Sequence, residues 1–184
     1  MENTQNNLET AVFGGGCFWC TEAVFQKLRG VKSVLPGYAG GHTENPNYYA
    51  VAKQDTGHAE VIQFIFDPTL ISFRDLLEVF FATHDPTTLN QQGYDKGPEY
   101  RSIILYTTEQ QKLEAEKIIQ ELNEAHAYEN PIVTTVEPLV KFYEAEAEHK
   151  NFYVNNPNSP YCQVIINPKI KKFKEKFASL IEED

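Results

Sequence analysis

Two cysteines, Cys17 and Cys20, lie three residues apart in VFGGGCFWC, which spans residues 12 to 20. A thiol that follows a strand and a glycine turn, at the first turn of a helix, meets unpaired backbone N–H groups and the positive end of the helix dipole. Such surroundings stabilise a thiolate and can lower a cysteine pKa from about 8.5 to between about 3.5 and 7.5. The three glycines before Cys17 would also let the backbone approach a ligand closely. We therefore identify Cys17 as a candidate nucleophile.

The Cys-x-x-Cys spacing by itself leaves several kinds of site open. At a helix start it is typical of thioredoxin-like dithiols, in which the second cysteine resolves a mixed disulfide. A zinc site fits poorly, because it needs two further ligands and the chain has neither a second cysteine pair nor a closely spaced histidine pair. Phe18 and Trp19 either wall a small apolar pocket beside the thiol or simply pack in the core.

The hydrophobic pattern predicts the elements that must position these residues. Strands are expected at 10–16, 31–41, 59–68, 101–107 and 132–138, and helices at 17–30, 48–53, 72–85, 108–126, 144–153 and 168–182. In the helix at 17–30, Glu22 near the start and Lys27 and Arg29 near the end suit the dipole. Thr108 and Gln111 form a predicted capping box. The segment 59–68 is nearly all apolar and should be a central strand covered on both faces.

This order of elements predicts an α/β fold, an α+β sandwich in which helices pack on one mixed sheet. A chain of 184 residues fits one domain. We assign residues 1–9 to a flexible polar leader and residues 10–184 to a single catalytic domain. The long loops at 83–98 and 152–168 are candidates for functional segments.

Composition excludes several classes of partner. The formal net charge of -10 argues against nucleic acid, because phosphate-backbone binding depends on Lys and Arg. No segment has the length of apolar sequence needed to cross a bilayer, and the N-terminus lacks the features of a signal peptide. We expect a cytoplasmic protein with no membrane partner. Three cysteines in a chain of this size argue against a structural disulfide framework.

Five separated blocks carry a resemblance to a known family: GGGCFWCTEAVF, GYAGGHTENPNYYAV, TGHAEVIQFIFDP, HDPTTLNQQGYDKGPEYRSIILY and NFYVNNPNSPYC. In this order, over residues 10 to 165, the chain resembles peptide methionine sulfoxide reductases of the A type. The resemblance implies a ferredoxin-like βαβ core and reduction of the S-epimer of methionine sulfoxide, free or in oxidised proteins. It also implies that no metal or organic cofactor is bound, and that an intramolecular disulfide and thioredoxin regenerate the enzyme. We expect a monomer.

The resemblance also implies roles for individual residues. Cys17 attacks the sulfoxide, and Glu60 protonates its oxygen, which suits a carboxyl whose pKa is raised by partial burial at the start of an apolar strand. Tyr48 and Tyr100 donate hydrogen bonds to that oxygen, and Asp95 helps to hold the polar side of the site. Phe18 and Trp19 cradle the methyl group of the substrate.

The thiol that resolves the sulfenic acid on Cys17 is less clear from the sequence, because Cys20 replaces a glycine of the most familiar family pattern. Cys162 matches the usual resolving position, and we place it ahead of Cys20, because a flexible loop can carry its sulfur to Cys17. Two alternatives stay open. One is a thioredoxin-like oxidoreductase that uses Cys17 and Cys20, and the other is a module that grips methionine side chains without turnover.

Overall fold

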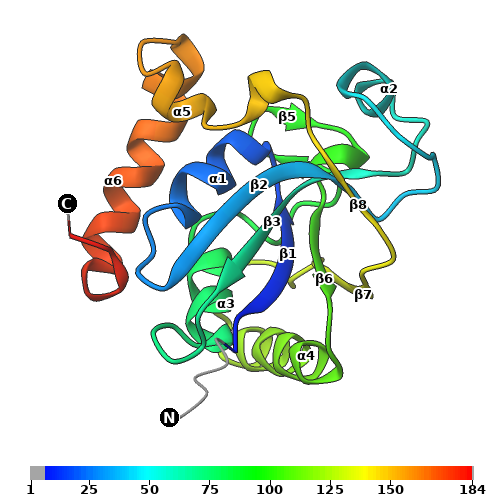
Figure 1. The fold of residues 1–184 in the computed structure, drawn as a ribbon. Helices are drawn as coiled ribbons and strands as arrows, with labels where there is room; N and C mark the ends of the chain where they lie inside the picture. Colours follow the sequence, from blue (N-terminus) through cyan, green and yellow to red (C-terminus); the bar gives the residue numbers. More distant parts are fainter. Residues whose placement is uncertain (1–6, 184) are drawn as a thin grey trace, which may run out of the picture.

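The main sheet collects strands from nearly the whole length of the chain (Figure 1). A computed structural model describes residues 7–183. The sheet contains β1 (Glu9–Gly15), β2 (Val31–Ala39), β3 (Ala59–Phe66), β6 (Ser102–Tyr106), β7 (Thr135–Pro138) and β8 (Phe142–Glu144). A separate two-stranded hairpin contains β4 (Gln91–Gln92) and β5 (Asp95–Lys96).

The helices include four of eight or more residues and several short turns. The α-helices are α1 (Phe18–Phe25), α2 (Tyr48–Ala52), α3 (Phe73–Ala82), α4 (Glu109–Glu124), α5 (Phe152–Asn155) and α6 (Asn167–Lys176). Short 3-10 turns occur at η1 (Pro98–Tyr100), η2 (Ala147–His149) and η4 (Ala178–Leu180), and the segment η3 (Cys162–Ile166) is a π-helix that runs directly into α6.

Strand order identifies the core of the fold. In the order β7-β6-β1-β3-β2-β8, β3 lies between β1 and β2 and is antiparallel to both, so that β1 and β2 are parallel and α1 joins them. In the same way β1 lies between β3 and β6, which α3 joins. Two interleaved βαβ units of this kind make a ferredoxin-like core, and the parallel pairing of β6 with β7 makes the sheet mixed. The predicted fold class is confirmed.

Side chains of the central strands alternate between two apolar layers. Phe13 of β1 faces the larger layer, where it packs against Phe64 and Phe80 under the helices, with ring centroids 5.1 and 4.8 Å away. Val12, its neighbour, faces a smaller layer on the opposite side of the sheet, against which Leu139 and Phe142 pack. Both faces of β3 are therefore covered, as its apolar sequence predicts.

Local capping signals explain where the longer helices begin. Ser72 and Asp75 form a reciprocal capping box at the start of α3. At α4, Thr108 accepts a hydrogen bond from the backbone N–H of Gln111, as predicted. The Gln111 side chain, however, accepts from the N–H of Thr107, so the predicted capping box at α4 is wrong in its second half.

Several boundaries differ from the predicted ones. Helix α1 ends at Phe25, five residues before Gly30, because Leu28 leaves the helix to form a bridge with Ile181. The hairpin β4–β5 and the strand β8 lie in segments predicted as loop or helix, and the predicted helix at 144–153 breaks into η2 and the start of α5. Residues 1–6 of the predicted leader lie outside the described residues, and Glu9 already belongs to β1. Within residues 7–183, no helix has the length and apolar character needed to cross a membrane.

Candidate active site

A sharp turn between β1 and α1 places Cys17 at the N-cap position of α1, where its side chain is 9% exposed. Gly16 makes the turn with φ +94°, a conformation that side chains other than glycine rarely adopt. A Cβ on Gly14 would lie 2.9 Å from the carbonyl oxygen of Glu60. A Cβ on Gly15 would lie 3.0 Å from the Phe80 ring. Gly14 and Gly15 thus permit close packing of the protein itself, whereas we predicted close approach of a ligand.

The pKa of the Cys17 thiol is raised well above its ordinary value, first by burial and then by the charge of Glu60. Our prediction of a lowered pKa at the helix start is therefore wrong. The backbone N–H of Trp19 does act on the sulfur in the lowering direction. The N–H of Phe18, however, donates to the Glu60 carboxylate at 3.0 Å, and so part of the helix N-terminus is directed at Glu60.

Glu60 lies in β3, opposite Tyr38 of β2, and is 3% exposed. Burial raises its pKa to about 8, although the hydrogen bond from Phe18 acts in the opposite direction. Asp95 and Glu99 add to the rise. At neutral pH Glu60 is therefore a protonated carboxylic acid next to the residue that follows Cys17 in the chain, which is the state that a general acid requires.

Tyr48, Tyr100 and Asp95 belong to the same group of side chains. Burial raises the pKa of both tyrosines, and the next contributions to both come from Glu60 and then Cys17. Asp95 also raises both pKa values. Both hydroxyls stay protonated at neutral pH and can donate hydrogen bonds. The structure thus brings the five predicted catalytic residues together from α2, η1, the hairpin, β3 and the β1–α1 turn.

Aromatic side chains surround Trp19 on several sides. Its indole stacks on Phe152 with the ring centroids 3.6 Å apart and the planes 5° from parallel. Its ring nitrogen donates to Nδ1 of His149 at 3.2 Å, and Tyr161 meets it edge-on. Phe18, which is 1% exposed, packs against the other side of His149. Phe18 and Trp19 are therefore members of a larger aromatic cluster.

The sequence analysis missed three residues of this cluster: His149, Phe152 and Tyr161. They lie in short segments without hydrophobic periodicity, although Phe152 and Tyr161 fall within the last of the five blocks that carry the family resemblance. Tyr161 has a further role, because its hydroxyl donates to Asp95 at 2.9 Å. Since the hydroxyl has one hydrogen, the Cys20 thiol, whose sulfur is 3.6 Å from the same oxygen, is the donor in that contact.

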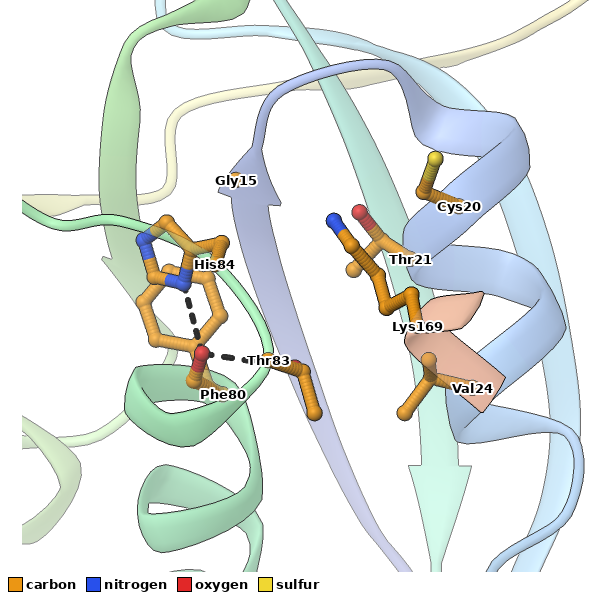
Figure 2. Close-up of a pocket in the computed structure, with 8 residues that line it drawn as sticks. All are labelled: Gly15, Cys20, Thr21, Val24, Phe80, Thr83, His84 and Lys169. Atoms are coloured by element: carbon orange, nitrogen blue, oxygen red, sulfur yellow. Dashed lines mark hydrogen bonds between the residues drawn. The ribbon is translucent and has the colours of Figure 1, made fainter. Parts of the chain in front are cut away.

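Cys20 and Cys162 are both buried free thiols, 3% and 0% exposed. Cys162 is the first residue of the π-helix η3, and its N–H donates to the Ser159 hydroxyl. The expected flexible loop around Cys162 is therefore wrong for this state of the protein. Cys20 lies in the first turn of α1. Figure 2 shows that Cys20 and Lys169 both line a narrow cavity between α1 and α3. Cys17 and Cys20 also line a groove that opens toward the hairpin.

One group of side chains has the ligand types of a metal site. Oxygen and nitrogen atoms of Glu146, Glu148 and His149 lie within 4.8 Å of one another. Since Trp19 donates to Nδ1 of His149, the proton of the neutral ring is on Nε2, which faces Glu146 at 3.4 Å. This Nε2 atom is buried and makes no hydrogen bond of regular geometry, so the hydrogen bond from Trp19 to Nδ1 is the contact that orients His149.

Comparison with known proteins agrees with this arrangement. The sequence model described as peptide methionine sulfoxide reductase matches residues 9–181. A protein of Sulfolobus acidocaldarius named peptide methionine sulfoxide reductase MsrA is 54% identical over 174 residues, which cover 92% of this chain and 96% of the relative. The protein of the same name from Ralstonia nicotianae is 52% identical over 95% of this chain and 94% of its own length.

Solved structures show the same likeness. The reduced form of Mxr1 from Saccharomyces cerevisiae superimposes with a TM-score of 0.78 and 32% identity, covering 88% of this chain and 92% of that chain. The methionine sulfoxide reductase A of Corynebacterium diphtheriae gives a TM-score of 0.75 and 32% identity, over 86% and 80% of the two chains. With a matching family model over nearly the whole chain and relatives about half identical in sequence, the chain belongs to the peptide methionine sulfoxide reductase family, enzymes that reduce methionine sulfoxide.

Proposed function

We propose that the protein reduces the S-epimer of methionine sulfoxide, free or in proteins, through a sulfenic acid on Cys17. The observation that carries the proposal is the buried acid Glu60, with its pKa raised to about 8, held against the backbone next to the Cys17 thiol. A sulfoxide oxygen leaves sulfur poorly unless it gains a proton. A thiol and a protonated carboxyl side by side supply the nucleophile and that proton. The preference for the S-epimer is what the family resemblance implies.

In the proposed reaction the Cys17 sulfur attacks the sulfoxide sulfur as Glu60 gives its proton to the oxygen. Tyr48 and Tyr100 donate hydrogen bonds to that oxygen while its charge develops. The oxygen then passes to Cys17, the thiol proton returns to Glu60, and methionine leaves. The substrate sulfur gains two electrons and Cys17 loses two. Phe18 and Trp19 hold the methyl group, and Asp95 orients Tyr161 at the polar edge.

A second thiol then resolves the sulfenic acid. Cys162 attacks the Cys17 sulfur, water leaves, and a Cys17–Cys162 disulfide remains for thioredoxin to reduce. A relative supports the last step, because Mxr1 has been solved in complex with Trx2, at 25% identity and a TM-score of 0.55 over 83% of this chain and 89% of that chain. Cys20 is the alternate resolving thiol. No metal or organic cofactor takes part, and we propose a cytoplasmic monomer.

Product formation tests the central proposal. The protein is incubated with the S- and R-epimers separately in dithiothreitol, and methionine is measured. We expect methionine from the S-epimer only, and none with Cys17→Ser. A folded wild-type protein that binds the sulfoxide without forming methionine would instead favour a binding module, and equal product from Cys17→Ser would exclude Cys17 as the nucleophile.

Mass mapping of the disulfide tests the resolving step. The enzyme is oxidised with one equivalent of sulfoxide, alkylated and digested. We expect a Cys17–Cys162 bridge. Cys162→Ser should complete one turnover but slow thioredoxin-dependent cycling, with a milder effect of Cys20→Ser. A Cys17–Cys20 bridge as the main species would assign resolution to Cys20.

A further inference from the structure

Glu22 is a buried carboxyl that the proposed reaction does not use. It lies in α1 one turn after Trp19 and is 1% exposed, and neither carboxyl oxygen makes a hydrogen bond of regular geometry to any described residue. Burial raises its pKa to about 7. We predicted that Glu22, with Lys27 and Arg29, suits the dipole of this helix, and that prediction is wrong, because α1 has no acidic residue in its first turn and no basic residue in its last. A buried polar group without regular partners requires an explanation, because an apolar side chain of the same size would cost less to bury.

The Glu22 carboxyl faces one particular segment, the start of α5. The backbone N–H groups of Asn151 and Phe152 act on it in the direction that lowers its pKa, as nearby donors do, although neither makes a hydrogen bond of regular geometry to it. The first N–H groups of a helix have no acceptor within the helix. Asn151 has left-handed backbone angles, φ 52° and ψ 34°, and its side chain does not cap α5.

The Asn151 side chain is used in a second contact with α1. Its Oδ1 accepts a hydrogen bond from Nε2 of Gln26 at 2.7 Å. Gln26 follows Glu22 by four residues, so the two side chains lie on the same face of α1. Gln26 therefore holds Asn151 against α1, and in Figure 1 α5 lies beside α1. Glu22 is the buried member of this pair, and Gln26 is half-buried.

The position of residue 152 matters because its ring covers Trp19. The stacking distance of 3.6 Å requires the α5 backbone to stay close to α1. We propose that Glu22 is a positioning residue of the methyl-binding pocket, which holds the backbone of residues 151–152 so that Phe152 remains stacked on Trp19. The proposal rests on the proposed function of this pocket. Loss of the carboxyl should weaken substrate binding and leave the chemical step at Cys17 and Glu60 intact.

Replacement of Glu22 by Met separates this role from a role in stability. Glu22→Met fills similar volume without a buried charge, and such replacements are often neutral or stabilising. We expect an unchanged or higher Tm together with a KM for methionine sulfoxide raised about threefold to tenfold, the range for losing one hydrogen-bonding group. The single-turnover rate at saturating substrate should stay near that of the wild type. Glu22→Gln, which keeps one acceptor oxygen, should lie between the two proteins, and Glu116→Gln on the exposed face of α4 is the matched control.

Trp19 provides a readout that does not depend on activity, because it is the chain's only tryptophan. Acrylamide should quench its fluorescence more strongly in Glu22→Met than in the wild type. The double variant Glu22→Met/Phe152→Ala should have the same KM as Phe152→Ala alone, because Glu22 acts through Phe152. A folded Glu22→Met protein with unchanged quenching and KM overturns the proposal, as does a loss confined to the single-turnover rate. If the wild-type protein formed no methionine, the proposed function would fail, and quenching would still test the position of Phe152.

Discussion

At the scale of single residues, the Cys17 thiol and the Glu60 carboxyl both keep their protons at neutral pH. Burial is the first cause of the raised pKa of both Cys17 and Glu60, and each negative charge would raise the cost of the other. A neutral thiol and a neutral acid are therefore the resting pair. In the proposed reaction, the sulfoxide oxygen takes the proton of Glu60, and the Cys17 thiol loses its proton as its bond to the sulfoxide sulfur forms. The proposed reaction therefore needs no thiolate in advance.

The pH dependence of the chemical step should report Glu60. Its pKa of about 8 means that the acid form predominates below that pH and is lost above it. We expect the single-turnover rate of methionine formation to fall as pH rises through about 8. Glu60→Gln removes the proton but keeps the shape, and should slow the step by a factor of about 10² to 10⁴. If the single-turnover rate of Glu60→Gln also fell as pH rises through about 8, the pH dependence would belong to another group.

The same group should lower stability at neutral pH. The folded pKa of Glu60 is about 8 against an ordinary value of 4.5. Between these values the unfolded chain has released the proton and the folded protein has not, so the free energy of unfolding falls as pH rises. Glu60→Gln should therefore be more stable than the wild type by about 2 to 3 kcal/mol at pH 7 and nearly equal to it near pH 4.5. Urea unfolding in dithiothreitol at pH 7 and pH 4.5 measures the free energies of unfolding of the two proteins. A difference between them that is equal at both pH values would contradict the prediction.

At the scale of elements, the turn between β1 and α1 decides where the nucleophile lies. Gly16 has φ +94°, and a Cβ there would lie 2.6 Å from Cγ of Gln92 in β4. The turn before Cys17 and the hairpin are therefore packed against each other.

Gly16 and Gly93 both have a positive φ, and substituting each by alanine separates the cost of backbone strain from the cost of a steric clash. Gly93 also has a positive φ, +57°, but a Cβ there would meet nothing within 4 Å. We expect Gly16→Ala to destabilise the protein by about 2 to 4 kcal/mol and to lower kcat/KM, because strain and a steric clash add together. Gly93→Ala should cost about 1 kcal/mol, from strain alone, and keep kcat/KM. Thermal unfolding and steady-state kinetics compare the two, and equal losses would show that contact with Gln92 is unimportant.

Elements with a periodic pattern could be predicted from the sequence, whereas short ones could not. The strand at 59–68 and the helices begun by Ser72 and Thr108 are found close to their predicted bounds, because burial or a cap marks them locally. The hairpin, β8 and the π-helix at Cys162 have too few residues for a pattern. Cys17 was identified as a candidate nucleophile from its local sequence, whereas Glu60 and the other proposed catalytic residues came from the family resemblance. The sign of the Cys17 pKa shift could not be predicted, since burial is set by distant segments.

At the scale of the whole molecule, the core of the described residues is built without methionine. The chain contains 12 Phe and a single Met, which is residue 1. The buried apolar side chains of the described residues are aromatic and branched aliphatic groups, with alanines and the three cysteines, and rings such as Phe13, Phe25 and Phe64 fill its centre. Phenylalanine fills the volume that a flexible thioether fills in many other cores. An enzyme that works where methionine is oxidised therefore has almost no methionine to lose.

This composition predicts that oxidative inactivation is reversible. Brief treatment with hydrogen peroxide should modify cysteines only, and slowly, because the three thiols are buried and a thiol with a raised pKa is a weak nucleophile. Sulfenic acids and disulfides return to thiols in dithiothreitol, whereas a sulfoxide in the core would persist and disrupt packing. We expect dithiothreitol to restore the activity of the untreated enzyme, with peptide mass mapping to confirm that the cysteines are again free. If activity stayed lost although every cysteine was again a free thiol, oxidation of another side chain would be the cause of inactivation.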